Sequence, residues 1–198
     1  MKLFCSPPSP YTSKVRMAAC HLGIELEEIV VNTADNPPEL ISANPLGKIP
    51  TLITDDGQAV FDSRAIMQLL HRTAKKRLYP KKHAKRTEAE VLEALCDGIG
   101  DCLLAIVYEK RLRPPELQSQ DAIDRQWAKV ERGLDYLDGH MPKLGKTLHG
   151  GHFALAAVLG YLMLRFPGEW ENGRTRLAAW PGKFSERFKG YAELRPQA

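Results

Sequence analysis

The sequence predicts a small α/β domain followed by an all-helical domain. Strand patterns occur only in the first 61 residues, in the order strand, helix, strand, connector, hairpin, and a helix follows the hairpin. After residue 80 no strand pattern returns, and helical patterns continue to the end of the chain. A chain of 198 residues allows one or two domains. We expect the α/β domain at 1–75, a linker at 76–85 and the helical domain at 86–198.

The first part of the α/β domain is a strand, a helix and a second strand. Residues 2–5 are an apolar run, and the proline-rich loop 6–10 follows it. Helical spacing then relates Val15, Ala18, Ala19 and Leu22. Gly23 stands where a C-cap is expected, and residues 29–31 form the second strand. Because a helix connects the two strands, we expect them to pair in parallel.

The second part is a hairpin and a helix. Segments 51–54 and 58–61 flank Asp55-Asp56-Gly57, a turn signal, and an amphipathic helix is predicted over 63–74. This order of elements predicts a thioredoxin-like arrangement, with a four-stranded mixed sheet and helices on both faces.

The helical half contains four predicted helices. The first covers about 86–112 and ends before two prolines. Apolar residues at alternating steps of four and three predict an amphipathic helix over 123–137. The almost entirely apolar segment 153–166 should be the central buried helix, and a last helix is expected near 174–190.

Composition excludes several classes of protein. With 43% apolar and 26% charged residues, the chain is not disordered. No apolar run approaches the roughly 20 residues of a membrane span, and early prolines argue against a signal peptide. The four cysteines lack metal-ligand spacing, which indicates reduced thiols in a cytoplasmic protein and no metal site.

The net charge of +4 is concentrated in one segment. Seven basic residues lie between Lys75 and Arg86. A nucleic-acid patch has this charge, but interleaved aromatic residues are missing apart from Tyr79. We interpret the run as a solvated linker, and a nucleic-acid partner is not expected.

The segment 44–66 combines features that suit a small acidic peptide as ligand. Pro50 has no N–H, so the backbone before it cannot be fully used by the protein's own sheet. Ser63, as an expected N-cap, would place a hydroxyl and free helical N–H groups where a carboxylate can dock.

Three motifs in this order resemble the cytosolic glutathione transferases, in particular bacterial serine-type members. They are residues 6–16 as the first loop and helix, 44–50 as the cis-proline loop, and 62–66 as the γ-glutamyl site. Segments 94–101 and 159–162 resemble the helical domain of a bacterial subgroup. The resemblance covers the whole chain and implies the glutathione transferase fold, glutathione as co-substrate without a metal, a small electrophile as second substrate, and a homodimer.

The resemblance also implies roles for individual residues. Ser9 is the expected catalytic hydroxyl that contacts the thiol, and Ser6, Thr12 and Tyr11 are alternatives. Cys5 is the alternative for covalent chemistry through a mixed disulfide. The backbone of Ile49, beside a cis Pro50, would pair with the cysteinyl unit. Asp62 would face the ammonium and Ser63 the carboxylate of the γ-glutamyl unit, while Lys48 would meet the glycyl carboxylate.

The second-substrate pocket is expected between the domains. Tyr11 and Tyr108 are its predicted residues, together with Leu104 and Ile106. Glu109, Arg111 and Arg113 are expected near its mouth, and Asp97 or Asp101 is expected to reach across a dimer interface.

The chain departs from the family where the buried helix begins. The usual Ser/Thr-x-x-Asp cap is replaced by His149-Gly150-Gly151-His152. No third metal ligand accompanies the two histidines, so we expect a surface role or a substitute cap.

We therefore predict an enzyme that transfers glutathione to small electrophiles. The alternatives are a glutathione-dependent peroxidase or disulfide reductase, and a non-catalytic regulatory or scaffold protein of the same fold. The presence of Pro50, Asp62 and Ser63 argues against a site that has lost the ability to bind glutathione.

Overall fold

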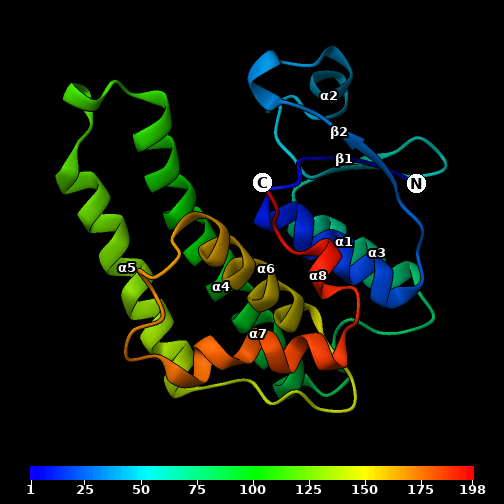
Figure 1. Ribbon diagram of the computed structural model, residues 1–198. Helices are drawn as coiled ribbons and strands as arrows, with labels where there is room; N and C mark the ends of the chain where they lie inside the picture. Colours follow the sequence, from blue (N-terminus) through cyan, green and yellow to red (C-terminus); the bar gives the residue numbers. More distant parts are fainter.

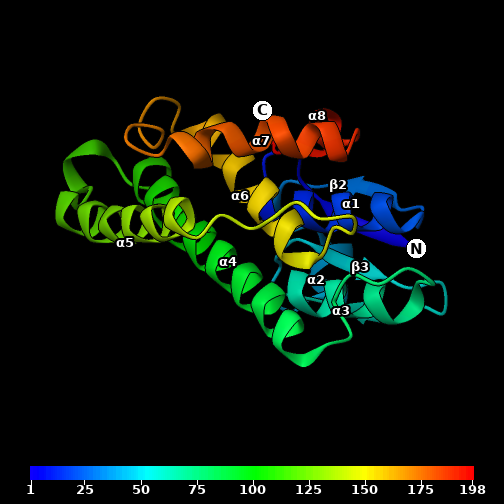
Figure 2. The same ribbon diagram turned by 90° about the horizontal axis from the view of Figure 1, so that it is seen from below.

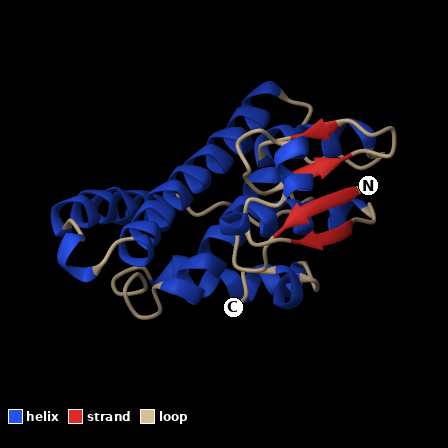
Figure 3. Ribbon diagram, turned by 90° about the horizontal axis from the view of Figure 1, so that it is seen from above, coloured by secondary structure: helices blue, strands red, loops and turns tan.

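The computed structural model describes all 198 residues and begins with a mixed four-stranded sheet. The strand order is β2-β1-β3-β4; β1 and β2 are parallel, and the other two pairs are antiparallel (Figure 3). The elements are β1 (Lys2–Cys5), α1 (Pro10–Leu22), β2 (Glu27–Val30), a 3₁₀ turn (Thr33–Asp35), α2 (Pro38–Ala43), β3 (Thr51–Ile53), β4 (Ala59–Val60) and α3 (Ser63–Thr73). The predicted mixed sheet is confirmed.

Helices cover both faces of this sheet. In Figure 1, α1 and α3 lie between the sheet and the helical half, whereas α2 lies on the opposite side. Both α1 and α3 bury much of their length, while α2 buries only Leu40. The face of the sheet that α1 and α3 cover therefore belongs to the main core.

The second half is entirely helical, as predicted. It consists of α4 (His83–Leu112), a 3₁₀ turn (Pro115–Leu117), α5 (Gln120–Gly139), α6 (Gly150–Arg165), α7 (Thr175–Arg187) and α8 (Tyr191–Leu194). Figure 2 shows α4 running from beside the α/β domain to the far end of the molecule, where α5 returns alongside it. The nearly all-apolar α6 packs against both α4 and α1, so one continuous core joins the two halves. No helix is long and apolar enough to cross a membrane.

Three details differ from the sequence-based expectation. Helix α4 begins at His83, inside the segment assigned to the linker. The linker is also anchored rather than fully solvated, since Leu78 and Tyr79 are buried. The short helix α2 was not predicted, because six residues after two prolines show no periodicity. The predicted last helix, near 174–190, is α7 and ends at Arg187, with Pro181 inside it.

The unusual start of α6 is explained by close packing. A Cβ added at Gly150 would lie 2.7 Å from the Tyr79 ring, and one at Gly151 would lie 2.7 Å from the backbone oxygen of Ala89 in α4. Only glycine permits this approach of α6 to α4 and the linker. The Nδ1 of His152 accepts the N–H of His149 at 3.1 Å, so His152 replaces half of the missing capping box. His152 is fully buried, so the expected surface role is wrong for it.

Burial of these two histidines predicts acid sensitivity. Burial lowers the pKa of His149 to about 4 and that of His152 to about 3, with the charge of His149 adding to the effect on His152. Both pKa values lie below the unfolded value of about 6.5, so the unfolded state binds more protons between pH 6.5 and 4. The contribution of the two neutral histidines to stability is therefore fully present above pH 6.5 and is lost as the pH falls below it. At pH 5 we expect a loss of up to about 2 kcal/mol for each histidine.

Urea unfolding at pH 7.5 and 5.0 measures this loss. The variant His149→Ser/His152→Asp, which restores the family's cap, should lose less stability between these pH values than the wild type. The variant should still lose some stability between pH 7.5 and 5.0, because burial also lowers the pKa of His21 to about 4. Equal pH slopes for wild type and variant would contradict this account.

Candidate active site

A cavity of about 660 Å³ lies between the α/β domain and the helical half. This volume is typical of small-molecule sites, which span about 300–1,000 Å³. One wall is formed by the loop after β1, the loop before β3 and the start of α3, and the other by α4 and α6. The lining residues include those expected to contact glutathione and the two tyrosines expected in the second-substrate pocket: Ser9, Tyr11, Lys48, Ile49, Pro50, Asp62, Ser63 and Tyr108.

Ser9 combines a structural and a chemical capability. It is the N-cap of α1, and its Oγ accepts the N–H of Thr12 at 3.2 Å. Because the oxygen acts as acceptor in this bond, its own proton remains free to donate into the cavity. The position beside a helix N-terminus further favours a negative charge nearby.

The alternatives to Ser9 are placed less favourably, except for Ser6. Ser6 lines the cavity, whereas Thr12 is buried and does not. The Tyr11 hydroxyl is engaged with Asp101, and burial together with this bond raises its pKa. Cys5 is buried outside the cavity, and burial, with Glu28, raises its pKa to about 11. A protonated, enclosed thiol is a poor nucleophile.

The loop before β3 presents unpaired main-chain groups to the cavity. The Ile49–Pro50 peptide bond is cis. Neither the N–H nor the C=O of Ile49 hydrogen-bonds within the chain. The loop itself is held by Asn44, whose side-chain amide donates to the Lys48 carbonyl at 2.9 Å and to Thr51 Oγ1 at 3.1 Å. An extended ligand therefore finds a free donor and acceptor on a fixed loop.

The start of α3 presents an anion-binding end. The N-cap is Asp62, whose Oδ1 accepts the N–H of Arg64 at 2.9 Å, so the expectation that Ser63 is the cap is wrong by one residue. Ser63 is the first helical residue and is 3% exposed. Its N–H makes no backbone hydrogen bond and lies at the positive end of the helix. A second cis peptide bond, Phe61–Asp62, precedes this turn.

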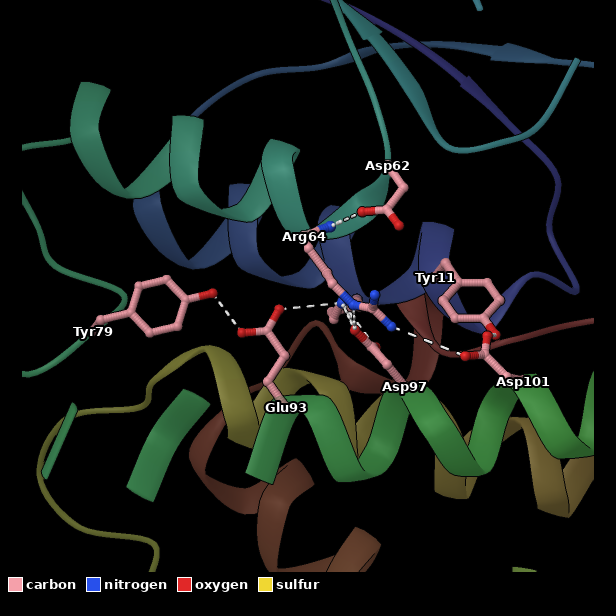
Figure 4. Close-up of polar contacts among 8 residues, drawn as sticks. Tyr11, Asp62, Arg64, Tyr79, Glu93, Asp97 and Asp101 are labelled. Carbon is pink, nitrogen blue, oxygen red and sulfur yellow. Dashed lines mark hydrogen bonds and ion pairs between the residues drawn. The ribbon is translucent and has the colours of Figure 1, made fainter. Parts of the chain in front are cut away.

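A buried ionic network joins this site to α4. Lys14, 1% exposed, contacts Asp97 at 2.8 Å and Glu93 at 3.1 Å. Asp97 also binds Arg64 Nε at 3.2 Å, and Arg64 lies 3.9 Å from Asp101. A tyrosine hydroxyl donates a hydrogen bond to the acid at each end of the network. Tyr79 donates to Glu93, and Tyr11 donates to Asp101. In Figure 4 the three acids project from α4 toward α1 and α3.

The sequence analysis did not find this network. Its acids lie at positions i, i+4 and i+8 of α4, a spacing that places Glu93, Asp97 and Asp101 on one helix face and was available as a signal. Lys14 was read only as part of the first motif, because buried lysines are rare. Asp97 and Asp101 are both engaged within their own chain, and the expectation that one of them reaches across a dimer interface stays a prediction.

The helical wall of the cavity is formed by the last turns of α4 and α6. Leu104, Val107, Tyr108 and Arg111 come from α4, and Tyr161 and Arg165 from α6. Ile106 is buried in the core, so its expected place in the pocket is wrong. Glu109 and Arg113 pair with each other at 3.1 Å and do not line the cavity.

Comparison with known proteins agrees with this geometry. The family model for the glutathione S-transferase N-terminal domain matches residues 8–73, and the model for the glutathione S-transferase C-terminal domain matches residues 120–180. The chain is 34% identical over 171 residues to the uncharacterised GST-like protein YibF of Escherichia coli K12, covering 83% of both chains. The chain therefore belongs to the glutathione S-transferase family.

Solved structures give the same result. A glutathione S-transferase of Methylobacillus flagellatus with glutathione bound is 34% identical, with a TM-score of 0.90 over 99% of both chains. A family member from Pseudomonas fluorescens Pf-5, with S-(propanoic acid)-glutathione bound, is 33% identical, with a TM-score of 0.85 over 100% of both chains. The glutathione transferase fold predicted from the sequence is confirmed.

Proposed function

We propose that this protein binds glutathione, ionises its thiol and transfers the tripeptide to small electrophiles. The observation that carries the proposal is that one cavity gathers the Ser9 hydroxyl, the unpaired backbone of Ile49 and the start of α3. Support also comes from relatives of similar length that hold glutathione or an S-substituted glutathione.

The proposed grip uses charge at both ends of the tripeptide and main-chain pairing in the middle. The N–H and C=O of Ile49 pair with the cysteinyl unit. Ser63 holds the γ-glutamyl carboxylate, and the oxygen of Asp62 that does not cap α3 faces the ammonium. Lys48 is exposed and forms no ion pair within the chain, so it is free to meet the glycyl carboxylate.

Ser9 then acts on the thiol. A thiol with a pKa of about 8.5 is only about 3% ionised at pH 7. Lowering the pKa to about 6.5 gives roughly three-quarters thiolate and requires about 2.7 kcal/mol of differential stabilisation. A hydroxyl donor beside a helix N-terminus supplies stabilisation of this kind.

Glutathione binding is tested by calorimetry on the wild type and Ser63→Ala. Loss of a hydroxyl that bonds a buried carboxylate should raise the Kd of glutathione about tenfold or more. Ser185→Ala, on α7 and away from the cavity, is the matched control. If Ser63→Ala bound glutathione as tightly as the control, the γ-glutamyl carboxylate would lie elsewhere.

Catalysis is tested with glutathione and 1-chloro-2,4-dinitrobenzene. Conjugation faster than the uncatalysed reaction supports the proposal. Binding without conjugation, but with turnover of cumene hydroperoxide or a glutathione mixed disulfide, would indicate the peroxidase or reductase alternative. Binding of neither glutathione nor its conjugates would indicate a scaffold protein.

We further propose a cytoplasmic homodimer, as the resemblance implies. Light scattering at micromolar protein concentration checks the mass in solution. A monomer at that concentration would contradict the dimer without affecting the site, because every contact described above lies within one chain.

A further inference from the structure

Two arginines face the cavity from its helical wall. Arg111 lies in the last turn of α4 and Arg165 in the last turn of α6. Both line the cavity, as do Tyr108 of α4 and Tyr161 of α6. The Arg111 guanidinium carbon lies 6.0 Å from the centre of the Tyr108 ring.

Tyr161 lines the same cavity wall as the two arginines, and both arginines are close enough to influence its hydroxyl. Burial raises the pKa of Tyr161, while the nearby charges of Arg165 and Arg111 act in the opposite direction. The hydroxyl is therefore a protonated donor that lies within the influence of both arginines. Tyr161 is 2% exposed, so its position is fixed by the core.

The charges of Arg111 and Arg165 are not neutralised by the chain. Three acids line the cavity, but Asp97 and Asp101 are committed to the ionic network and Asp62 caps α3. The acid nearest in sequence to Arg111, Glu109, pairs with Arg113 and accepts the N–H of Ser119 at 2.9 Å. The two acids that α4 adds to the helical wall, Asp97 and Asp101, are therefore already engaged, whereas Arg111 and Arg165 form no ion pair within the chain.

A simpler reading is that both arginines only complement their helix dipoles. Basic residues at helix C-termini are common, because the negative end of the helix dipole attracts them. That reading does not require the two side chains to face the same cavity, beside a buried phenol donor. It also predicts an effect on stability alone, so the two readings are separable by experiment.

We propose that the second substrate is a small electrophile that carries a carboxylate, bound by Arg111, Arg165 and the Tyr161 hydroxyl. The inference rests on the proposed transferase function and names its substrate class. Leu104, Val107 and Tyr108 contact the apolar body of the electrophile, while the arginines hold its anionic end.

A matched pair of aryl chlorides tests the proposal: 4-chloro-3,5-dinitrobenzoate and 4-chloro-3,5-dinitrobenzamide. In both, the thiolate sulfur bonds to the ring carbon that carries chlorine, and chloride leaves with the electron pair of the broken C–Cl bond. The thiol proton goes to water. The enzymatic kcat/KM is divided by the uncatalysed rate constant of each compound with glutathione, which removes their different intrinsic reactivity.

The corrected rate for the benzoate should exceed that for the benzamide about tenfold. Arg111→Gln and Arg165→Gln should each reduce this preference about threefold, and the double variant should abolish it. Arg113→Gln, an arginine of the same helix end outside the cavity, should retain the preference. Equal corrected rates in the wild type, or an undiminished preference in the double variant, would overturn the proposal. So would a double variant that lost stability and slowed both substrates equally.

Binding of the two conjugates separates this inference from the transferase proposal. Calorimetry uses chemically prepared S-(4-carboxy-2,6-dinitrophenyl)glutathione and its amide, with glutathione itself for reference. Tighter, arginine-dependent binding of the acid conjugate without any turnover would sustain the inference and remove the transferase function. Turnover of both compounds, with no preference for the acid in rate or binding, would sustain the transferase function and overturn the inference. A loss of glutathione affinity as large as the loss for the acid conjugate would place the arginines on glutathione and overturn the inference.

Discussion

Replacing Lys14 by methionine is expected to lower the free energy of unfolding by about 3–5 kcal/mol. Lys14 is the buried cation between Glu93 and Asp97, which are 6% and 4% exposed. Without it, Glu93 loses its cation, and Asp97 retains only Arg64. Breaking a buried pair by removing one partner leaves an uncompensated charge, which costs more than the pair contributes. Urea unfolding at pH 7.5 measures the change.

Two comparisons test the physical reason for this effect. Lys85→Met removes an exposed lysine that lies 2.7 Å from Glu88, and should cost less than about 1 kcal/mol. Adding Glu93→Gln and Asp97→Asn to Lys14→Met should recover part of the loss, because no buried charge is then left without a partner. A Lys14→Met protein as stable as Lys85→Met would mean that the three groups are not effectively buried.

The network also holds the site together. Arg64 follows the two residues assigned to the γ-glutamyl end, and Tyr11 belongs to the wall that carries Ser9. Both are tied to acids of α4, so the network fixes two segments of the α/β wall, the start of α1 and the start of α3, relative to the helical half (Figure 4). Lys14→Met is therefore expected to weaken glutathione binding as well as stability.

Replacing Ser9 by alanine is expected to lower kcat/KM for conjugation at pH 7 about 25-fold, the ratio of the two thiolate fractions, with nearly unchanged glutathione affinity. The thiol would lose its hydroxyl donor, whereas the contacts assigned to Ile49, Asp62 and Ser63 would remain. The pH profile should show the cause. Without the donor, the apparent pKa of bound glutathione should move up toward about 8.5, so the rate is recovered at high pH.

Loss of a helix cap must be separated from loss of the donor. Ser9 caps α1, so its removal also costs about 1 kcal/mol of stability. Ser119 caps α5 with the same geometry, its Oγ accepting the N–H of Ala122 at 3.2 Å, and lies outside the cavity. Ser119→Ala should match Ser9→Ala in stability and retain full turnover. If Ser9→Ala kept its turnover and Ser6→Ala lost it, the neighbouring hydroxyl would be the donor.

Local patterns predicted most of the fold. The strand–helix–strand unit, the hairpin turn at Asp55-Asp56-Gly57 and the helical second half follow from periodicity and turn chemistry, which act over a few residues. Boundaries were less accurate, as the start of α4 and the cap of α3 show, because the choice between adjacent capping residues depends on small energy differences. The helix α2 was missed for lack of any periodic signal.

The sequence alone determined the class of the fold and the segments that line the cavity, because their signals lie within short motifs. Tertiary structure decided how those segments are held. Three features join distant parts of the chain: the burial of Lys14 against acids about 80 positions away, the contact of Gly151 with α4, and the presence of Arg111 and Arg165 in one cavity. No local pattern specifies such contacts, since their energy depends on which surfaces exclude water together once the helices pack.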